Sequence, residues 1–583
     1  MTKSPAPSRA QPARPPPDAV AASEAQGPDP LRQPPDPRLL RRFGTLRAWR
    51  LGVLPWRRVG GAVVVLGPPP PDPELRRVVA LTGWTDLRWA PCRPDRIRAA
   101  LLPHVAPLLL LMAEARLPFD LSCRAVGRRP LALLGAGAFI VAGVAVALAP
   151  SAAMALLCAL GALVLILNGG LKLAAAIATL LRPPIRQDPA MITGAQLPMI
   201  SLLVPLFRES AMIKPLLERL ERLDYPPDRL ELRLIVEAGD RRTRAALAHA
   251  ALPDRAEVVV VPEGRVRTKP RALNYALFFT TGTIIGIYDA EDAPAPDQLL
   301  RVAARFAVCG RATGCLQGML DFYNPRCNWI ARCFALEYAS WFRVMLPGLE
   351  RLGLVVPLGG TTLFLRRHAI EAVGGWDAHN VTEDADLGVR LARHGFRTEL
   401  IDTVTREEAN ARAWPWIKQR ARWLKGYALS WGVAMHDPGR LWRELGPWRF
   451  LGVQALFLGT LTQFALAPLL WSFWLVVFGL PHPMAPWLRE GMLWGLALLF
   501  LLAECVTCSI AALAAWRAGQ PKLALWAPVL QVYFPLATIA VWRALWQVLR
   551  RPFHWDKTRH GIFTPAGSLS EPPPPSPRPA STA

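Results

Sequence analysis

Long apolar runs divide this chain into blocks. Residues 131–148 and 152–181 are each long enough to cross, as helices, the roughly 30 Å apolar core of a bilayer, and Pro150 and Ser151 separate them. The apolar character returns over residues 450–480, 492–515 and 523–545. The pattern therefore predicts a membrane hairpin at residues 131–181 and a second membrane region at residues 450–545.

The number of spans depends on the run 450–480, which is long for one helix and contains Pro468 near its middle. We expect a tight hairpin there, and hence six spans rather than five. Six spans place the basic residues that follow the last run, Arg550 and Arg551 among them, on the cytoplasmic side, where membrane proteins concentrate such residues.

Between the two membrane blocks, residues 187–443 alternate short β-like runs, such as 202–204 and 232–236, with helix-like ones. This alternation predicts an α/β domain with a largely parallel sheet. Residues 39–124, which contain the β-like run 62–66, predict a smaller α/β domain.

In that smaller domain a helix-like stretch begins at Pro94. The apolar run 108–112 is closed by Glu114 and is too short to cross a bilayer, so we expect a buried helix there. Residues 1–38 carry too little apolar surface to form a core, and we expect a disordered tail. Residues 546–583 are expected to form a cytoplasmic loop and a second disordered tail.

Composition narrows the class of protein. With 52% hydrophobic residues and a mean hydropathy of +0.22, the chain is too apolar for an ordinary soluble protein. Its formal net charge of +24 fits an anionic membrane face or a phosphorylated substrate, and because the basic residues flank apolar runs we disfavour nucleic acid. Cys505 and Cys508 form a C-x-x-C inside an apolar run, so we interpret them as packing residues.

An acidic cluster follows the β-like run 283–288. Asp289, Glu291 and Asp292 stand within four residues, at the carboxyl edge of the predicted sheet, where open α/β folds bind ligands. Such carboxylates repel one another unless a cation lies between them. Mg²⁺ or Mn²⁺, held by carboxylates and by substrate phosphates, fits this pattern. A solvated acidic turn is the alternative interpretation.

Two other segments offer polar groups to the same edge. Glu237 and Asp240 follow the β-like run 232–236. Lys269 and Arg271 are candidate phosphate partners, and Asn274 is a candidate hydrogen-bond partner for a ribose or a base. Taken alone, this second segment also fits a solvated helix start.

Two further motifs point to chemistry. Thr382-Glu383-Asp384 opens a helix-like stretch, either as a helix cap with an acidic first turn or as the site of a general base, Asp384. Gln419, Arg422 and Trp423 lie on one helical face at spacings of three and four residues. A helix lying on the membrane surface would explain their basic and aromatic surroundings without catalysis.

Taken in order, these motifs resemble the membrane-bound, processive family 2 glycosyltransferases, such as bacterial cellulose synthase and related β-glucan and hyaluronan synthases. The resemblance covers about residues 198–560. It implies an α/β GT-A-type (Rossmann-like) catalytic domain joined to transmembrane helices. The metal motif Asp-x-Asp of the family is matched by Asp289 and Glu291, with Asp292 as a further candidate ligand, and Thr-Glu-Asp and Gln-x-x-Arg-Trp are intact.

The resemblance implies an inverting transfer of a sugar, with UDP-glucose as the expected donor, to a growing β-linked polysaccharide that is exported through the membrane region. It makes Asp384 the base, with Glu383 beside it, and assigns Trp423, Gly359 and Gly360 to the acceptor. Asp289, Asp384 and Trp423 must then share one cleft. The residues assigned to the nucleotide-sugar are Glu237, Asp240, Lys269, Asn274, Asp289, Gln419 and Arg422.

Outside the catalytic part the resemblance is more distant. Residues 553–561 look like the cytoplasmic gating loop of cellulose synthases, and residues 39–124 are similar to the N-terminal domain of type II secretion ATPases, some of which bind cyclic di-GMP. We expect a multi-pass protein of the inner (cytoplasmic) membrane. Two alternatives stay open: transfer of one sugar to a lipid carrier, and a cyclic di-GMP-responsive scaffold with an inactive catalytic domain.

Overall fold

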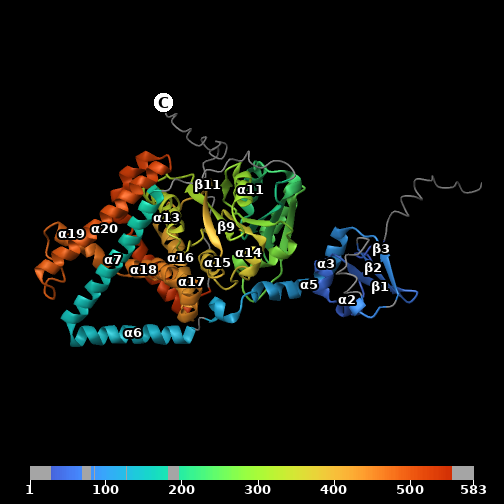
Figure 1. Cartoon of the computed structure of the whole chain (residues 1–583), viewed down its shortest axis with the longest axis horizontal. Helices are drawn as coiled ribbons and strands as arrows, with labels where there is room; N and C mark the ends of the chain where they lie inside the picture. The colour runs from blue at the N-terminus through green and yellow to red at the C-terminus, as the bar shows by residue number, and fades with distance from the viewer. Residues whose placement is uncertain (1–27, 68–79, 85, 126–127, 182–195, 554–583) are drawn as a thin grey trace, which may run out of the picture. The chain divides into compact units, whose positions relative to one another are not determined.

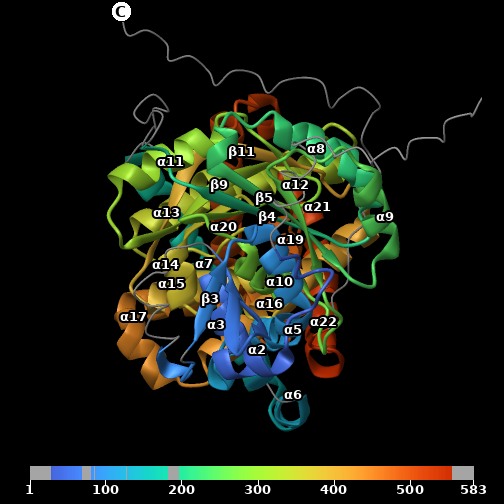
Figure 2. The same ribbon diagram turned by 90° about the vertical axis from the view of Figure 1, so that its right-hand side faces the viewer.

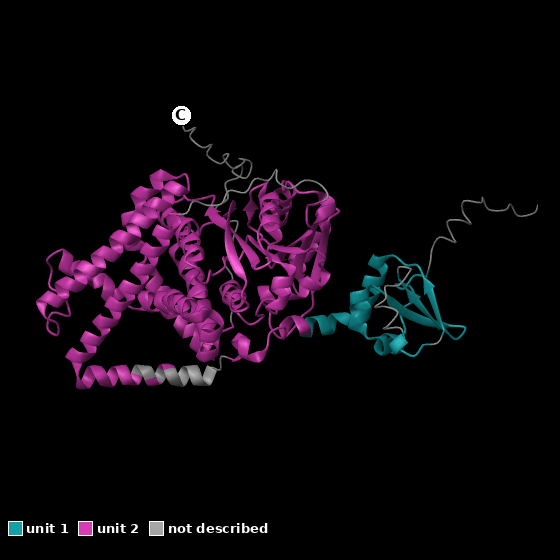
Figure 3. Ribbon diagram, in the orientation of Figure 1, with its two compact units in different colours: residues 1–111 teal, residues 112–583 magenta. Residues whose placement is uncertain are grey.

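A computed structural model describes residues 28–67, 80–84, 86–125, 128–181 and 196–553 of the chain (Figure 1). Two compact units are present, residues 1–111 and residues 112–583 (Figure 3). Most of the expected N-terminal tail and all of the chain after Phe553 lie outside the described residues.

The first unit is a small α/β structure, as expected. Its three-stranded sheet has the order β1-β2-β3, with β1 antiparallel and β3 parallel to β2. Every residue of β2, the central strand of this sheet, is buried. The elements are α2 (Pro37–Phe43), α3 (Thr45–Leu51), β1 (Leu54–Val59), β2 (Ala62–Leu66), β3 (Leu87–Ala90) and the start of α5 (Pro94–Glu114).

Two expectations for this region need correction. Residues 28–36 are part of the fold, since the Asp36 N–H donates to the Trp56 carbonyl (2.8 Å) and the Trp56 indole N–H donates to the Gln33 carbonyl (2.7 Å). The run 108–112 is not a short buried helix. It is the end of the 21-residue α5, in which Leu109 is buried but Leu111 is 57% exposed.

The second unit contains an eight-stranded sheet with the order β6-β5-β4-β7-β10-β9-β11-β8. Strands β6, β5, β4 and β7 are parallel, and β9 and β11 run in the same direction as these four. Only β10 and the short β8 are antiparallel to their neighbours, so the sheet is mixed but largely parallel. Its strands are β4 (Ile200–Leu206), β5 (Leu230–Glu237), β6 (Ala256–Val261), β7 (Ile284–Ile287), β8 (Ala293–Pro294), β9 (Thr313–Phe322), β10 (Leu363–Arg366) and β11 (Arg397–Glu407).

Helices cover the sheet and form the main core with it (Figure 2). The apolar faces of α8 and α11 pack against the alternating leucines and valines of β4 and β5. The helices and turns of this domain are η5 (Ser210–Met212), α8 (Ile213–Glu221), η6 (Pro227–Arg229), α9 (Arg241–His249), α10 (Lys269–Ala276), η7 (Leu277–Phe279), α11 (Gln298–Val308), α12 (Trp329–Ser340), η8 (Trp341–Met345), α13 (Leu346–Arg351), α14 (Arg367–Ala372), α15 (Glu383–Arg393) and α16 (Ala413–Ala434).

Apolar helices make up the rest of the second unit. Many of their leucines, isoleucines and tryptophans face outward, as lipid-facing residues do. The elements are η1 (Phe119–Leu121), η2 (Cys123–Ala125), α6 (Arg128–Leu148), α7 (Pro150–Leu181), α17 (Pro438–Val453), η9 (Gln454–Leu458), α18 (Gly459–Ala465), α19 (Ala467–Val477), α20 (Glu490–Arg517), η10 (Pro521–Val529), α21 (Leu530–Tyr533) and α22 (Pro535–Arg550).

Within the described ranges, α5, α7 and α20 are long and apolar enough to cross a membrane, and two bent helix pairs bring the number to five at most. The expected hairpin at Pro468 is wrong. The helices on either side of Leu466 are bent by 62°, which does not reverse the chain. Pro468 lies in the first turn of α19, where a proline breaks no helical hydrogen bond, so the chain bends there and continues.

Candidate active site

A cleft lies in the second unit at the edge of the sheet where β4, β5 and β7 end. Parallel strands bring their carboxyl ends to one edge, and the polar residues that follow them meet there. Asp289, Asp384 and Trp423 all line this cleft, as the sequence interpretation requires. Its other lining residues include Glu237, Arg267, Lys269, Glu291, Tyr338, Gly359, Gly360, Glu383, Glu407, Gln419 and Arg422.

The turn after β7 presents two carboxylates to the cleft and buries a third. Asp289 and Glu291 line the cleft, whereas Asp292 is 1% exposed. One Asp292 oxygen accepts hydrogen bonds from the Asp289 N–H (2.8 Å) and from the Thr361 hydroxyl. Burial, with the charges of Asp289 and Glu291, raises the pKa of Asp292 well above its usual range. The structure therefore shapes the turn with Asp292 and does not support it as a metal ligand.

Asp289 and Glu291 fit a divalent cation that also binds phosphate oxygens. Across the ranges that the structure describes, no three histidine, cysteine or acidic side chains gather into a set able to hold a metal ion. Magnesium in nucleotide sites is commonly held by one or two carboxylates together with the substrate phosphates. A pair of carboxylates in an open cleft matches that donor set once a nucleotide diphosphate is bound.

Lys269, the first residue of α10, brings a cation to the same place. Its ammonium group lies 2.6 Å from an Asp289 oxygen and donates to the Gly360 carbonyl (2.9 Å). Burial alone would lower the pKa of Lys269, but Asp289, Glu383 and Asp384 raise it above its ordinary value. Lys269 therefore stays protonated and offsets the negative charge of the cleft.

The Thr382-Glu383-Asp384 motif lies at the N-terminus of α15. Both acids line the cleft, and one Asp384 oxygen accepts from the Ala385 N–H (2.8 Å). Burial raises the pKa of Asp384, while Lys269 and Arg422 limit the rise. Burial and the neighbouring Asp384 raise the pKa of Glu383 to about 7, against the pull of Lys269. A carboxylate with a raised pKa is a stronger base than a solvated one.

Two glycines allow the motif to approach its neighbours closely. Gly426 of α16 lies against Thr382, and a Cβ at this position would overlap the Thr382 hydroxyl. Gly360 has a φ of +81°, and a Cβ there would lie 2.8 Å from an Asp384 oxygen. Both positions therefore need glycine, and Gly360 belongs to the surroundings of the candidate base.

Helix α16 supplies the third side of the cleft. Gln419 accepts a hydrogen bond from the Asn410 amide (2.8 Å), which fixes its orientation. The Trp423 ring lies 6.1 Å from the Phe334 ring and 6.2 Å from the Tyr338 ring. Arg422 lines the cleft and makes no ion pair with any described residue. Its guanidinium group is thus available to an anionic ligand.

Two assigned residues do not reach the cleft. The Asp240 carboxylate caps α9 by accepting from the Thr243 N–H (3.2 Å), and it also accepts from the Arg208 N–H (2.5 Å). The Asn274 side chain is fully buried and bonds the backbone of Ala113 and Trp376. Both groups bind the protein's own backbone, so the structure does not support their assignment to the nucleotide.

Three more expectations have mixed outcomes. Glu237 lines the cleft, but a buried ion pair with Arg271 engages one of its oxygens, so Arg271 is not a free phosphate partner. Gly359 and Gly360 both line the cleft. Of the segment resembling a gating loop, only Phe553 is among the described residues, and its ring lies 6.1 Å from the His379 ring.

Glu407 is a lining residue that sequence reasoning missed. It is the last residue of β11, and burial together with Asp292, Glu291 and Asp289 raises its pKa well above the usual range. The available signal was its place at the end of a strand, as with Asp289. Its strand lies on the far side of β10 from β7 but runs in the same direction as β7, so both strands end at the same edge of the sheet.

Comparison with known proteins agrees with this geometry. The family described as Glycosyltransferase like family 2 matches residues 198–426. The β-monoglucosyldiacylglycerol synthase of Synechocystis sp. (strain ATCC 27184 / PCC 6803 / Kazusa) is 30% identical over 349 residues, which are 57% of this chain and 70% of that protein. Cellulose synthase 1 catalytic subunit [UDP-forming] of Komagataeibacter xylinus is 27% identical over 278 residues, 46% of this chain and 35% of that protein.

Among solved structures, the mannosyltransferase PcManGT from Pyrobaculum calidifontis, in complex with GDP-Man and Mn²⁺, aligns with 67% of this chain and 99% of its own. The TM-score is 0.43 and the identity 20%. On the strength of the family match and the Synechocystis relative, the chain belongs to the family 2 glycosyltransferases, and it is a glycosyltransferase with a GT-A-type catalytic fold.

Proposed function

We propose that the chain transfers a sugar from a UDP-sugar, with UDP-glucose as the first donor to test, to a hydroxyl of a growing β-linked polysaccharide, with inversion at the anomeric carbon. The observation that carries this proposal is the shared cleft. There the candidate base, Asp384, lies with two carboxylates that fit a divalent cation, Asp289 and Glu291, and with the guanidinium group of Arg422.

The residues on the donor side would bind and stabilise the leaving nucleotide diphosphate. Asp289 and Glu291 would hold Mg²⁺ or Mn²⁺, which neutralises charge on the departing nucleotide diphosphate. Arg422 offers planar, paired N–H donors to phosphate oxygens. Lys269 adds a fixed positive charge beside Asp289. Together these charges would stabilise the negative charge that develops as the glycosidic bond breaks.

Asp384 acts on the acceptor. Its raised pKa makes it the stronger base for removing the proton of an attacking hydroxyl. Glu383 is buried beside it, and the negative charges of the two acids disfavour full ionisation of the pair. Attack from the face opposite the diphosphate inverts the anomeric centre, so the product of an α-linked UDP-sugar is β-linked.

Aromatic and polar side chains support a path for the acceptor beyond Asp384. Trp423 and Tyr338 line the cleft and offer flat apolar faces to a sugar ring. Next to Tyr338, Glu337 accepts from Arg420 (2.5 Å) and from the Tyr533 hydroxyl (2.7 Å). Ionisable residues among apolar helices often mark a hydrophilic route, which supports export of the polymer.

A second candidate acceptor is the hydroxyl of a membrane lipid. The Synechocystis relative, which aligns with 57% of this chain, is named a β-monoglucosyldiacylglycerol synthase. The donor chemistry would be the same, and the enzyme would release its product after one transfer. A decayed catalytic domain acting only as a cyclic di-GMP-responsive scaffold is disfavoured, because the cleft keeps its candidate base, its guanidinium and its acidic pair.

The proposal places the protein in the inner membrane with the cleft on the cytoplasmic side, where UDP-sugars are made.

The test uses the purified full chain in detergent with Mg²⁺ and a panel of nucleotide-sugars, and first measures release of the nucleoside diphosphate. Products from the active donor are then separated into glycolipid and polymer. UDP release with a ladder of lengthening β-linked products supports the polysaccharide, and a single glycolipid supports the lipid acceptor. Release from no donor contradicts the proposal.

A further inference from the structure

We propose that Asp377 is a positioning residue for the transfer reaction: it ties a strap, residues 113–125, to the loop of residues 376–382 that leads into Asp384. We call this loop the base loop. The inference rests on the proposed role of Asp384 as the base. It assigns to Asp377 no contact with substrate.

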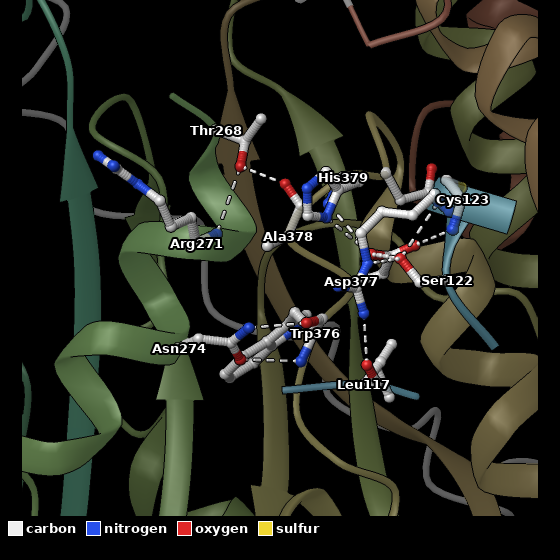
Figure 4. Close-up of polar contacts among 12 residues, drawn as sticks. Leu117, Ser122, Cys123, Thr268, Arg271, Asn274, Trp376, Asp377, Ala378 and His379 are labelled. Carbon is white, nitrogen blue, oxygen red and sulfur yellow. Dashed lines mark hydrogen bonds and ion pairs between the residues drawn. The ribbon is translucent and has the colours of Figure 1, made fainter. Parts of the chain in front are cut away.

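Asp377 is the hub of the connection (Figure 4). Its side chain is 2% exposed. One oxygen accepts from the Ser122 hydroxyl (2.8 Å) and from the His379 N–H (3.1 Å), and the other accepts from the Cys123 N–H (2.7 Å). Burial alone would raise the pKa of Asp377, but hydrogen bonds from His379, Cys123 and Ser122 lower it, so the group is an anion. A buried anion with this many donors fixes the strap and the loop together.

A second set of hydrogen bonds holds the strap and the base loop. The Asn274 amide donates to the Ala113 carbonyl (3.0 Å) and to the Trp376 carbonyl (2.7 Å), and its oxygen accepts from the Trp376 N–H (3.0 Å). The Thr268 hydroxyl donates to the Ala378 carbonyl (2.6 Å). Figure 4 shows the Thr268–Ala378 and Asn274–Trp376 contacts to the left of Asp377, with Ser122 and Cys123 to its right.

Apolar packing connects the strap to the loop next to the candidate base. Cys123 is fully buried in a cluster that contains Val381 of the base loop and Leu429 and Val433 of α16. Val381 directly precedes Thr382. The strap therefore contacts the loop by hydrogen bonds at Asp377 and by van der Waals packing at Val381.

The far end of the base loop is also fixed. Asn380 accepts from the Thr382 N–H (3.1 Å) and donates to the Ser430 hydroxyl on α16 (3.0 Å). With both ends held, the loop determines where α15 begins and where Asp384 lies. A displacement of about 1 Å at a catalytic group can lower the rate about 100-fold. Loss of the Asp377 hub should therefore lower turnover more than donor binding.

The test is Asp377→Asn in the full chain, with kcat and the KM for the UDP-sugar measured separately. The amide has nearly the same shape, but it carries no charge and turns an N–H₂ toward a donor. We expect kcat to fall about 100-fold with KM changed less than about threefold. The matched control is Asp120→Asn, because Asp120 lies on the strap but is exposed and pairs with Arg440. The control should keep both constants.

Ser122→Ala provides a milder variant if Asp377→Asn does not fold, and it should lower kcat about threefold to tenfold. Wild-type kcat in Ser122→Ala, or a loss in Asp377→Asn that appears equally in KM, overturns the positioning role. Asp384→Asn is measured in parallel. If Asp384→Asn retains full activity, the proposed function fails, whereas an inactive Asp384→Asn beside fully active strap variants rejects the positioning role alone.

Discussion

The proposed donor side of the cleft is formed by the ends of strands β4, β5 and β7 together with Arg422 of α16, whereas the proposed acceptor side is formed by the start of α15 and by Trp423 of α16. On the donor side, charges are already paired, as between Lys269 and Asp289. On the acceptor side, Asp384 and Trp423 come from elements that pack against apolar helices and against the strap. The comparison suggests a division of labour within our proposal: the donor would bind mainly at the edge of the sheet, whereas helix packing would position the base.

The largest effect is expected from replacing the proposed base, Asp384, on the acceptor side. Asp384→Asn should lower kcat by about 10²–10⁴-fold, the usual contribution of a general base, while UDP still binds. UDP release and UDP binding are measured on the same preparation. Asp402→Asn, outside the cleft on β11, is the control and should behave as wild type. Full activity of Asp384→Asn would reject its role.

On the donor side, Arg422→Ala should lower kcat by about 10²–10³-fold, because it removes donors to the developing charge of the leaving group. Steady-state kinetics with the UDP-sugar measure this effect. Lys418→Ala, an exposed cation on the same helix, should leave kcat unchanged. Equal losses in the two variants would mean that only the charge of α16 matters.

Gly426→Ala disturbs the packing on the acceptor side and leaves every proposed catalytic and binding side chain in place. The added methyl group would overlap Thr382, and overpacking of this kind costs about 1–3 kcal/mol. We expect a lower melting temperature and a fall in kcat approaching 100-fold as the base shifts. Gly432→Ala is a matched control, since no atom lies within 4 Å of its added Cβ. Unchanged kcat in Gly426→Ala would contradict the packing argument.

Trp423→Ala should weaken acceptor binding and spare the donor. Loss of an aromatic contact of about 1.4 kcal/mol corresponds to a tenfold rise in acceptor KM. Product length and acceptor KM are the readouts, and the KM for the UDP-sugar should stay constant. Trp414→Ala is the control, because Trp414 is 52% exposed on the same helix. A rise in the KM for the UDP-sugar alone would mean that Trp423 binds the donor and not the acceptor.

The smallest effect concerns pH. The Glu383 and Asp384 pair must lose a proton to act, so kcat/KM should rise with pH, with an apparent midpoint near 7 rather than near that of a free carboxyl. Lys269 lowers the pKa of both acids, so Lys269→Gln should move the midpoint to higher pH. Lys418→Gln should not move it. A shift to lower pH in Lys269→Gln would have the wrong sign.

The sequence located the parts of the cleft that stand at the ends of regular elements. Asp289 follows a strand, Asp384 opens a helix and Trp423 lies on a helical face, so the pattern of apolar positions fixed their surroundings. It could not decide the role of Asp240 or Asn274. A polar side chain near a motif is equally suited to a ligand and to the protein's own backbone, and only tertiary contacts choose between them.

Two other outcomes depended on geometry that no local pattern contains. Glu407 reaches the cleft because β11 runs in the same direction as β7, so that both strands end at the same edge of the sheet. The bend at Leu466 was mistaken for a hairpin, because Pro468 in a first helical turn is compatible with continuing the chain as well as with reversing it.

The central claim is that Asp384 activates a hydroxyl for one direct displacement at the anomeric carbon. The most direct test is the anomeric configuration of the first linkage formed from an α-linked UDP-sugar, determined by NMR on the product of the purified full chain. Our account predicts a β linkage, formed by wild type and lost in Asp384→Asn. An α linkage would show retention and would contradict it.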